Sequence, residues 1–293
     1  MYLENINGPS DIQKLNLDEL RILADETRDA LIHKISLAGG HNGPNLGMVE
    51  VTTALHYVFH SPIDKFVFDV SHQSYPHKIL TGRKQAFLDE EHFHDVTGYT
   101  NPEESEHDFF TIGHTSTSIS LALGLAKGRD LNHGKENIIA IIGDGSLSGG
   151  EALEALDYAG EYRNNLIIIV NDNDQSIAEN HGGLYKNLKE LRESNGNCTN
   201  NIFESFGLEY HYLEDGHDLF KLVDLFNSVK DIDHPVVLHI HTIKGKVKGK
   251  GLAYAEKIEK HGMQVVHSMW KMVVLVLLVV AMTRLYLTAL KHF

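Results

Sequence analysis

The stretch Ile138-Ile139-Ala140-Ile141-Ile142-Gly143-Asp144-Gly145 decides the fold, because a short apolar run ends there in a glycine turn that carries a carboxylate. A second stretch, Leu166-Ile167-Ile168-Ile169-Val170-Asn171-Asp172-Asn173, repeats this design. Continuous apolar runs of this length are typical of parallel strands buried on both faces. The interval between Asp144 and Asn173 has room for one helix and one strand, so we expect both residues at the same carboxyl edge of one sheet.

The rest of the chain extends this α/β pattern. A helix is predicted to begin after Asn16, because Asn16 can cap it and Glu19 can reach back to form a capping box. Strands and helices alternate further on, which predicts a parallel sheet covered by helices on both faces. We expect further strands at 66–70 and 236–241, and helices at 49–59, 150–162 and 219–229. Residues 1–262 are predicted to form one domain.

Composition excludes some classes of protein. The 293 residues carry a formal charge of −14, which argues against nucleic acid as a partner because phosphate backbones select basic surfaces. Cys198 is the only cysteine, so no internal disulfide can form and a reducing compartment is indicated. The first ten residues have neither a basic nor an apolar signal segment, so we expect a cytoplasmic protein.

The tail, residues 263–293, is atypical, with an unbroken apolar run at 272–282. A bilayer needs about 20 apolar residues, and a longer span would bury Arg284. Three interpretations stay open: a packed helix, a membrane anchor, and a segment foreign to the design of the domain. The short run argues against the anchor, so we expect no membrane association.

The residues at the expected sheet edge indicate a metal and phosphate site. The carboxylate of Asp144 and the amide oxygen of Asn173 are hard oxygen ligands of the kind that a divalent cation such as Mg²⁺ prefers. The glycines beside Asp144 would let a phosphate approach the backbone closely.

The two turns together resemble the signature of thiamine diphosphate enzymes. This resemblance implies that Asp144, Asn173 and the backbone carbonyl of Gln175 hold Mg²⁺ against the diphosphate of the cofactor. It also implies that Gly145 and Ser146 approach the diphosphate through their backbone amides, at the start of the next helix.

Further motifs resemble one family, the 1-deoxy-D-xylulose-5-phosphate synthases. General transketolases share the metal signature but not the His-Gln-x-Tyr-Pro-His-Lys run, so that run makes the resemblance specific. The matches follow in order over about residues 10–250 and resemble only the N-terminal region of the family. They comprise Gly39-Gly40-His41 followed by Leu46-Gly47-Met48-Val49-Glu50, the run from Asp69 to Gly82, Gly113 to Ser118, and Asp215-Gly216-His217-Asp218.

The resemblance implies roles for individual histidines. His72 would contact the cofactor diphosphate, while His41 would lie near the substrate and assist proton transfer, for which imidazole is suited. Gly113, His114 and Thr115 would line the cofactor. For His77 and His217 we predict structural hydrogen bonding instead.

A family lysine near the end of the matched region has two candidates. Three residues look inserted in the segment Thr242-Ile243-Lys244-Gly245-Lys246-Val247-Lys248, so either Lys244 or Lys248 could be that lysine. Ser71 stands where the family usually has glycine, before the histidine His72.

The implied reaction condenses pyruvate with glyceraldehyde 3-phosphate, with loss of CO₂, using thiamine diphosphate and Mg²⁺. Family enzymes are longer and form dimers, and their second domain supplies the glutamate that activates the cofactor. Nothing in residues 253–293 resembles that domain. We therefore expect either a homodimer or a partner chain that carries the pyrimidine-side domain. Two alternatives are the N-terminal subunit of a split transketolase-like enzyme and a catalytically silent chain.

Overall fold

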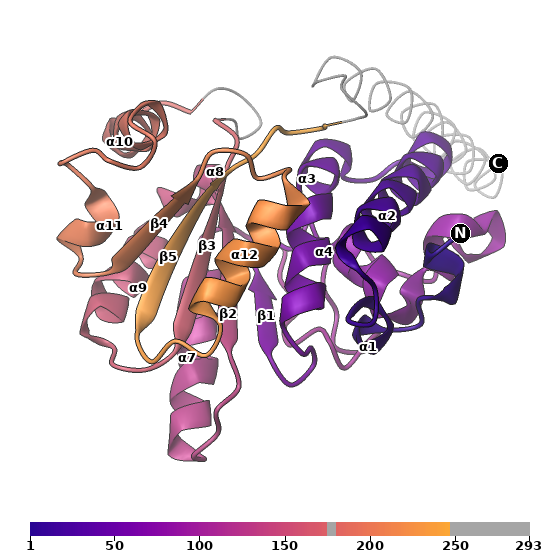
Figure 1. The fold of residues 1–293 in the computed structure, drawn as a ribbon, viewed down its shortest axis with the longest axis horizontal. Coiled ribbons are helices and arrows are strands. Elements are labelled where there is room, and N and C mark those ends of the chain that lie inside the picture. Colours follow the sequence, from indigo (N-terminus) through magenta and orange to yellow (C-terminus); the bar gives the residue numbers. More distant parts are fainter. Residues whose placement is uncertain (175–179, 247–293) are drawn as a thin grey trace, which may run out of the picture.

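The computed structural model describes residues 1–174 and 180–246 and contains a parallel sheet between two layers of helices (Figure 1). Gln175, Lys248 and the tail at 263–293 lie outside the described residues. The strands run in the spatial order β1-β2-β3-β5-β4, and every neighbouring pair is parallel. The predicted α/β class is therefore confirmed. The strands are β1 (Lys65–Phe68), β2 (Ile138–Gly143), β3 (Leu166–Asp172), β4 (Glu209–Leu213) and β5 (Pro235–His241).

The central strands are apolar throughout because successive side chains enter opposite cores. Ile139 and Ile141 of β2 belong to one buried cluster, whereas Ile138 and Ile142 belong to the other. This alternation follows from the two-residue period of a strand.

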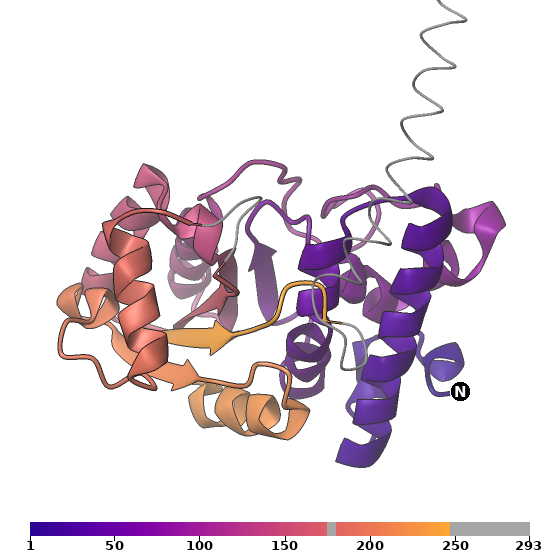
Figure 2. The same cartoon turned by 90° about the horizontal axis from the view of Figure 1, so that it is seen from above.

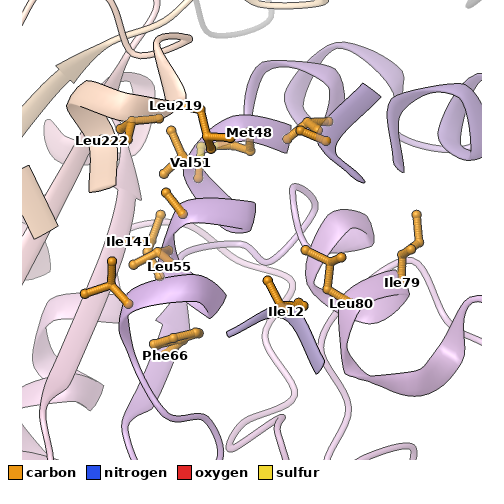
Figure 3. Close-up of a cluster of buried hydrophobic side chains, with 14 of the residues drawn as sticks. Ile12, Met48, Val51, Leu55, Phe66, Ile79, Leu80, Ile141, Leu219 and Leu222 are labelled. Atoms are coloured by element: carbon orange, nitrogen blue, oxygen red, sulfur yellow. The ribbon is translucent and has the colours of Figure 1, made fainter. Parts of the chain in front are cut away.

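One face of the sheet is covered by helices from both ends of the described chain, as Figure 1 shows for α2, α4 and α12. Figure 3 shows how Val51 and Leu55 of α4 lie beside Ile141 of the sheet and Leu222 of α12. The asparagine cap predicted for α2 is present, because Asn16 and Glu19 exchange capping hydrogen bonds. The helices on this side are α1 (Pro9–Ile12), α2 (Leu17–Ala38), α4 (Val49–Val58) and α12 (Leu219–Val229).

The opposite face packs against helices from the middle of the chain. Ile119 of α7 and Leu156 of α9 are fully buried there, as are Leu191 of α10 and Phe203 of α11. The helices on this side are α7 (Ser118–Leu131), α9 (Gly150–Glu161), α10 (Gly183–Glu193) and α11 (Ile202–Ser205).

Short helical segments occupy the connections. Three of them begin close to predicted site residues: α3 (Asn42–Gly47), α5 (Tyr75–Lys78) and α8 (Asp144–Leu147). The others are η1 (Leu3–Asn5), η2 (Ile79–Arg83), α6 (Gln85–Leu88) and η3 (Glu90–His92). Within the described ranges, no helix has both the length and the apolar character needed to cross a membrane.

His77 has the structural role predicted for it. Its Nδ1 lies 2.9 Å from Nε2 of His56, and its Nε2 lies 3.0 Å from a carboxylate oxygen of Asp108. Arg83 donates to the same carboxylate at 2.7 and 2.9 Å. These contacts fasten the long segment before α7 to α5 and η2, and so fix one wall of the sheet edge.

Removing one buried side chain from the α4 face should measure what this packing contributes. We expect Leu55→Ala to lower the free energy of unfolding by about 2–5 kcal/mol, because it deletes buried methyl groups and leaves a cavity. Urea unfolding of both proteins provides the measurement. Leu131→Ala is the matched control, since Leu131 is 81% exposed and should change stability little. Equal effects of the two substitutions would contradict the assigned core.

Candidate active site

The parallel register brings the two turns of the metal signature together. Gly143 of β2 pairs with Asn171 of β3, so the residues that follow leave the sheet side by side. Asp144 begins α8 directly after β2, and Asn173 follows β3. The structure therefore places Asp144 and Asn173 at the same carboxyl edge.

Asp144 is a buried carboxylate with little to balance its charge. Its side chain accepts a hydrogen bond from Asn180 Nδ2 at 2.8 Å. Burial, followed by the negative charge of Asp172, raises the pKa of Asp144 to about 7. A cation beside it would remove this penalty, because an opposite charge favours the ionised form.

Asn173 supplies the second polar group at this edge. Its Oδ1 is buried and has no hydrogen-bond partner among the described residues. A buried acceptor without a partner is costly, so this atom is suited to a ligand. Within residues 1–174 and 180–246, no group of three or more His, Cys, Asp or Glu side chains could hold a metal. The expected ligand set is of another kind: one carboxylate, one amide and the carbonyl of Gln175.

Asp172, between the two asparagines, is already paired. Its Oδ2 lies 2.5 Å from Arg192 Nη1 and 2.8 Å from His239 Nε2, and Tyr210 bonds the other nitrogen of His239 at 2.8 Å. Although burial opposes ionisation, the hydrogen bond and charge of His239, reinforced by Arg192, lower the pKa of Asp172 to about 2. This network holds Asp172 in place beside Asn173 at the carboxyl edge of the sheet. No pattern in the sequence predicted it.

A residue that follows β1 fixes the loop that is predicted to line the cofactor. Asp69, which follows β1 and is buried, accepts hydrogen bonds from the backbone amides of Ser116 and Ser118, each at 2.9 Å. Ser116 Oγ also donates to the carbonyl of Ser146 in α8 at 2.8 Å. These contacts place the exposed Gly113, His114 and Thr115 beside the metal edge.

Ser71, the departure from the family glycine, has a visible consequence. Its φ is +63°, in the left-handed region where glycine is usual. Its buried hydroxyl donates to the carbonyl of Ile112 at 2.8 Å and accepts from the amide of Thr100 at 3.0 Å. The serine hydroxyl therefore adds a bridge between the turn after β1 and two points of the segment before α7, which a glycine could not make.

The histidines His41 and His72 lie close together, and Asn45 bonds the backbone of both. Their ring centroids are 5.7 Å apart. Asn45, fully buried in α3, donates to the carbonyls of His41 and His72 at 2.5 and 2.7 Å and accepts from the amide of Tyr75 at 2.8 Å. Asn45 thus fixes both histidine-bearing turns, a role that the sequence pattern did not indicate.

His72 is neutral in this arrangement. Burial, and then the neighbouring His41 and Lys244, lower the pKa of His72 to about 4. Its Nδ1 is buried without a hydrogen-bond partner in the described part of the chain. A neutral imidazole with an unused nitrogen can bind or orient a ligand.

Lys244 adds a positive charge to the carboxyl edge of the sheet. It follows β5, and its positive charge acts on both His72 and Asp144. A Cβ at Gly43 would lie only 3.2 Å from Lys244 Cγ, so the lysine packs against the start of α3. Of the two lysine candidates, Lys244 is therefore placed at the site, while Lys248 lies outside the described residues.

The similarity of this chain to known proteins identifies its family. A family described as 1-deoxy-D-xylulose-5-phosphate synthase matches residues 3–199 and 194–242. The chain belongs to this family. The synthase from Alkaliphilus oremlandii is 41% identical over 302 residues, covering 91% of this chain and 48% of that protein. The synthase from Halalkalibacterium halodurans is also 41% identical, over 89% of this chain and 46% of its own length.

This chain thus spans about half the length of the curated synthases it matches. Solved transketolases share the fold of this chain. The transketolase of Campylobacter jejuni aligns with a TM-score of 0.67 at 20% identity, over 85% of this chain and 43% of its own. That of Leishmania mexicana aligns with a TM-score of 0.59 at 20% identity, over 77% of this chain and 37% of its own.

The depressed pKa of His72 gives a direct test of the site geometry. We expect the imidazole of His72 to titrate near pH 4 in an NMR titration, assigned by comparison with His72→Gln. Lys244→Met should move this midpoint upward, because it removes a nearby positive charge.

His234 is the internal control, since Asp233 and Glu209 raise its pKa above the ordinary histidine value. A midpoint for His72 at the ordinary value near 6.5, unchanged by Lys244→Met, would contradict the described packing.

Proposed function

We propose that this chain forms the diphosphate- and Mg²⁺-binding part of a 1-deoxy-D-xylulose-5-phosphate synthase. The observation that carries the proposal is a pair of groups at one sheet edge: the buried carboxylate of Asp144, whose pKa is raised, and the buried amide oxygen of Asn173, which has no partner among the described residues. The family match gives this edge its chemical context.

The residues at the edge fit thiamine diphosphate and Mg²⁺. Asp144 and Asn173, with the carbonyl of Gln175, would hold the cation, which keeps water and phosphate oxygens as its other ligands. Backbone amides of Gly145 and Ser146 would face the diphosphate, and Gly113, His114 and Thr115 would line the cofactor. When bound, thiamine diphosphate would supply the carbanion chemistry that joins pyruvate to glyceraldehyde 3-phosphate with loss of CO₂.

The protein groups would orient the reactants and move protons. His72, neutral because of its burial, can hydrogen-bond the diphosphate without adding charge. His41, adjacent to His72, is the group proposed to exchange protons with the substrate. Lys244 would add positive charge for the phosphate groups.

Activation of the cofactor is proposed to come from a pyrimidine-side domain outside residues 1–262. The carboxylate of that domain would reach this site from a separate partner chain. This arrangement describes a split transketolase-like enzyme.

Replacing the proposed metal ligand should remove cofactor binding. We expect Asp144→Ala to abolish Mg²⁺-dependent binding of thiamine diphosphate in calorimetry, because the cation loses its carboxylate ligand. The matched control is Asp157→Ala, an exposed aspartate on α9, which should bind as the unchanged chain does. Equal affinity of the Asp144→Ala chain would rule out the metal assignment.

Reconstitution tests the proposed activity. We expect turnover of pyruvate and glyceraldehyde 3-phosphate when this chain is mixed with the C-terminal half of the Alkaliphilus oremlandii synthase. Asp144→Ala in the mixture should abolish turnover. Cofactor binding without turnover and without a complex would favour a catalytically silent chain.

A further inference from the structure

The segment after β5 leaves the sheet and crosses to the first helical layer. We call residues 242–246 the strap, and Figure 2 shows it running from the end of β5 toward the N-terminal helices. The amide of Thr242 still bonds the carbonyl of Asp172 at 2.8 Å, and the amide of Gly245 bonds the carbonyl of Gly43 at 3.0 Å. The strap therefore joins the metal edge to α3, with Lys244 between these two contacts.

The strap fits closely over α3. A Cβ at position 47 would lie 3.4 Å from the carbonyl oxygen of Ile243, as a Cβ at position 43 would lie 3.2 Å from Lys244. Gly43 thus lies against the side chain of Lys244, and Gly47 lies against the backbone of the strap. Close packing alone does not fix the strap along its length, so its polar contacts decide its position.

Besides these backbone contacts, the side chains of His217 and Arg28 bond the strap on either side of Lys244. The backbone amide of Ile243 donates to Nε2 of His217 at 2.8 Å. The carbonyl of Lys246 accepts from Nη1 of Arg28 at 2.7 Å, and the same guanidinium nitrogen donates to the carbonyl of Leu46 at 2.7 Å.

Glu50 joins these two contacts into one network. One of its carboxylate oxygens bonds Nη2 of Arg28, and the other lies 3.0 Å from Nδ1 of His217. The side chains of Arg28 and His217 are almost fully buried, and that of Glu50 is 13% exposed. The bonds of Arg28 and His217 to the carboxylate of Glu50 are charge-assisted, which makes them stronger than bonds between neutral groups.

The two contacts of His217 determine which of its ring nitrogens carries the proton. A backbone N–H can only donate, so Nε2 of His217 must present its lone pair to Ile243. The proton of the neutral ring then lies on Nδ1 and is donated to Glu50. Arg28 in turn neutralises Glu50, so each member sets the geometry of the next.

We propose that Arg28, Glu50 and His217 are positioning residues that hold the strap, and with it Lys244, against the active-site edge. They come from α2, α4 and the turn before α12, and none of them is among the residues assigned to the cofactor or the metal. The placement of the strap is independent of the proposed function, and only the role of Lys244 toward phosphate groups rests on it.

Two substitutions of His217 in the 293-residue chain distinguish its contact with Glu50 from its contact with Ile243. His217→Asn can still donate to Glu50 but is too short to reach Ile243, whereas His217→Gln can reach the amide. We expect His217→Asn to accelerate hydrogen exchange at Ile243 and Gly245 roughly tenfold, and to speed tryptic cleavage after Lys244. His217→Gln should restore much of the protection. His234→Asn is the matched control, since His234 also bonds carboxylates but lies before β5.

Unchanged exchange at Ile243 in His217→Asn would overturn the proposal. An equal loss of protection in β3 would also overturn it, because His217 would then support the whole fold rather than the strap. If His217→Asn fails to fold, the comparison passes to Glu50→Gln, which keeps the hydrogen-bonding shape but removes the charge that links Arg28 to His217. Unchanged strap exchange in that variant would equally contradict the network.

Two further readouts separate this inference from the proposed function. Release of the strap should raise the titration midpoint of His72, because Lys244 moves away, whereas a purely structural His217 would leave it unchanged. Calorimetry with Mg²⁺ and thiamine diphosphate should show weaker binding in His217→Asn. Absence of binding in the unchanged chain would reject the proposed function while leaving the strap measurement valid. A released strap with unchanged affinity would reject the positioning of Lys244 for the cofactor.

Discussion

The parallel register of β2 against β3 is the constraint on which the rest of the site depends. Because Gly143 lies opposite Asn171, the chain leaves both strands at the same level, and Asp144 and Asn173 emerge as neighbours. A shift of one residue would turn the side chains of a strand to the opposite face. Both faces of these strands are filled by buried side chains, so the two hydrophobic cores indirectly hold the polar edge in place.

Several of the supporting contacts around this edge join a side chain to a backbone group. Asp69 holds the amides of the loop before α7, Asn45 holds the carbonyls of two histidine turns, and Ser71 bonds two points of the segment before α7. Such contacts fix where a loop runs while leaving the side chains of the loop available. This is why His72 and Asn173 can retain buried atoms that have no partner among residues 1–174 and 180–246.

The sequence predicted the elements with a strong local pattern. Continuous apolar runs identified four of the strands, whereas β4 was not predicted, because Glu209-Tyr210-His211-Tyr212-Leu213 is half-exposed at the sheet edge and mixes polar with aromatic residues. The turn Asn171-Asp172-Asn173 indicated a metal edge, yet only the structure separates Asp172, paired with Arg192 and His239, from Asn173. Asn45 and Arg28 carry no such pattern, because partners such as His72 and Lys246 are brought near them only by the folded chain.

The contact between Arg28 and the carbonyl of Lys246 spans 218 positions of sequence. On a ribosome, α2 is made early, and its guanidinium can pair with Glu50 and the carbonyl of Leu46 soon afterwards. Its third partner, the carbonyl of Lys246 in the strap, arrives only after β5 has been synthesised. The order of translation therefore makes closure of this corner a late event, and the site is completed only when both ends of the described chain have met.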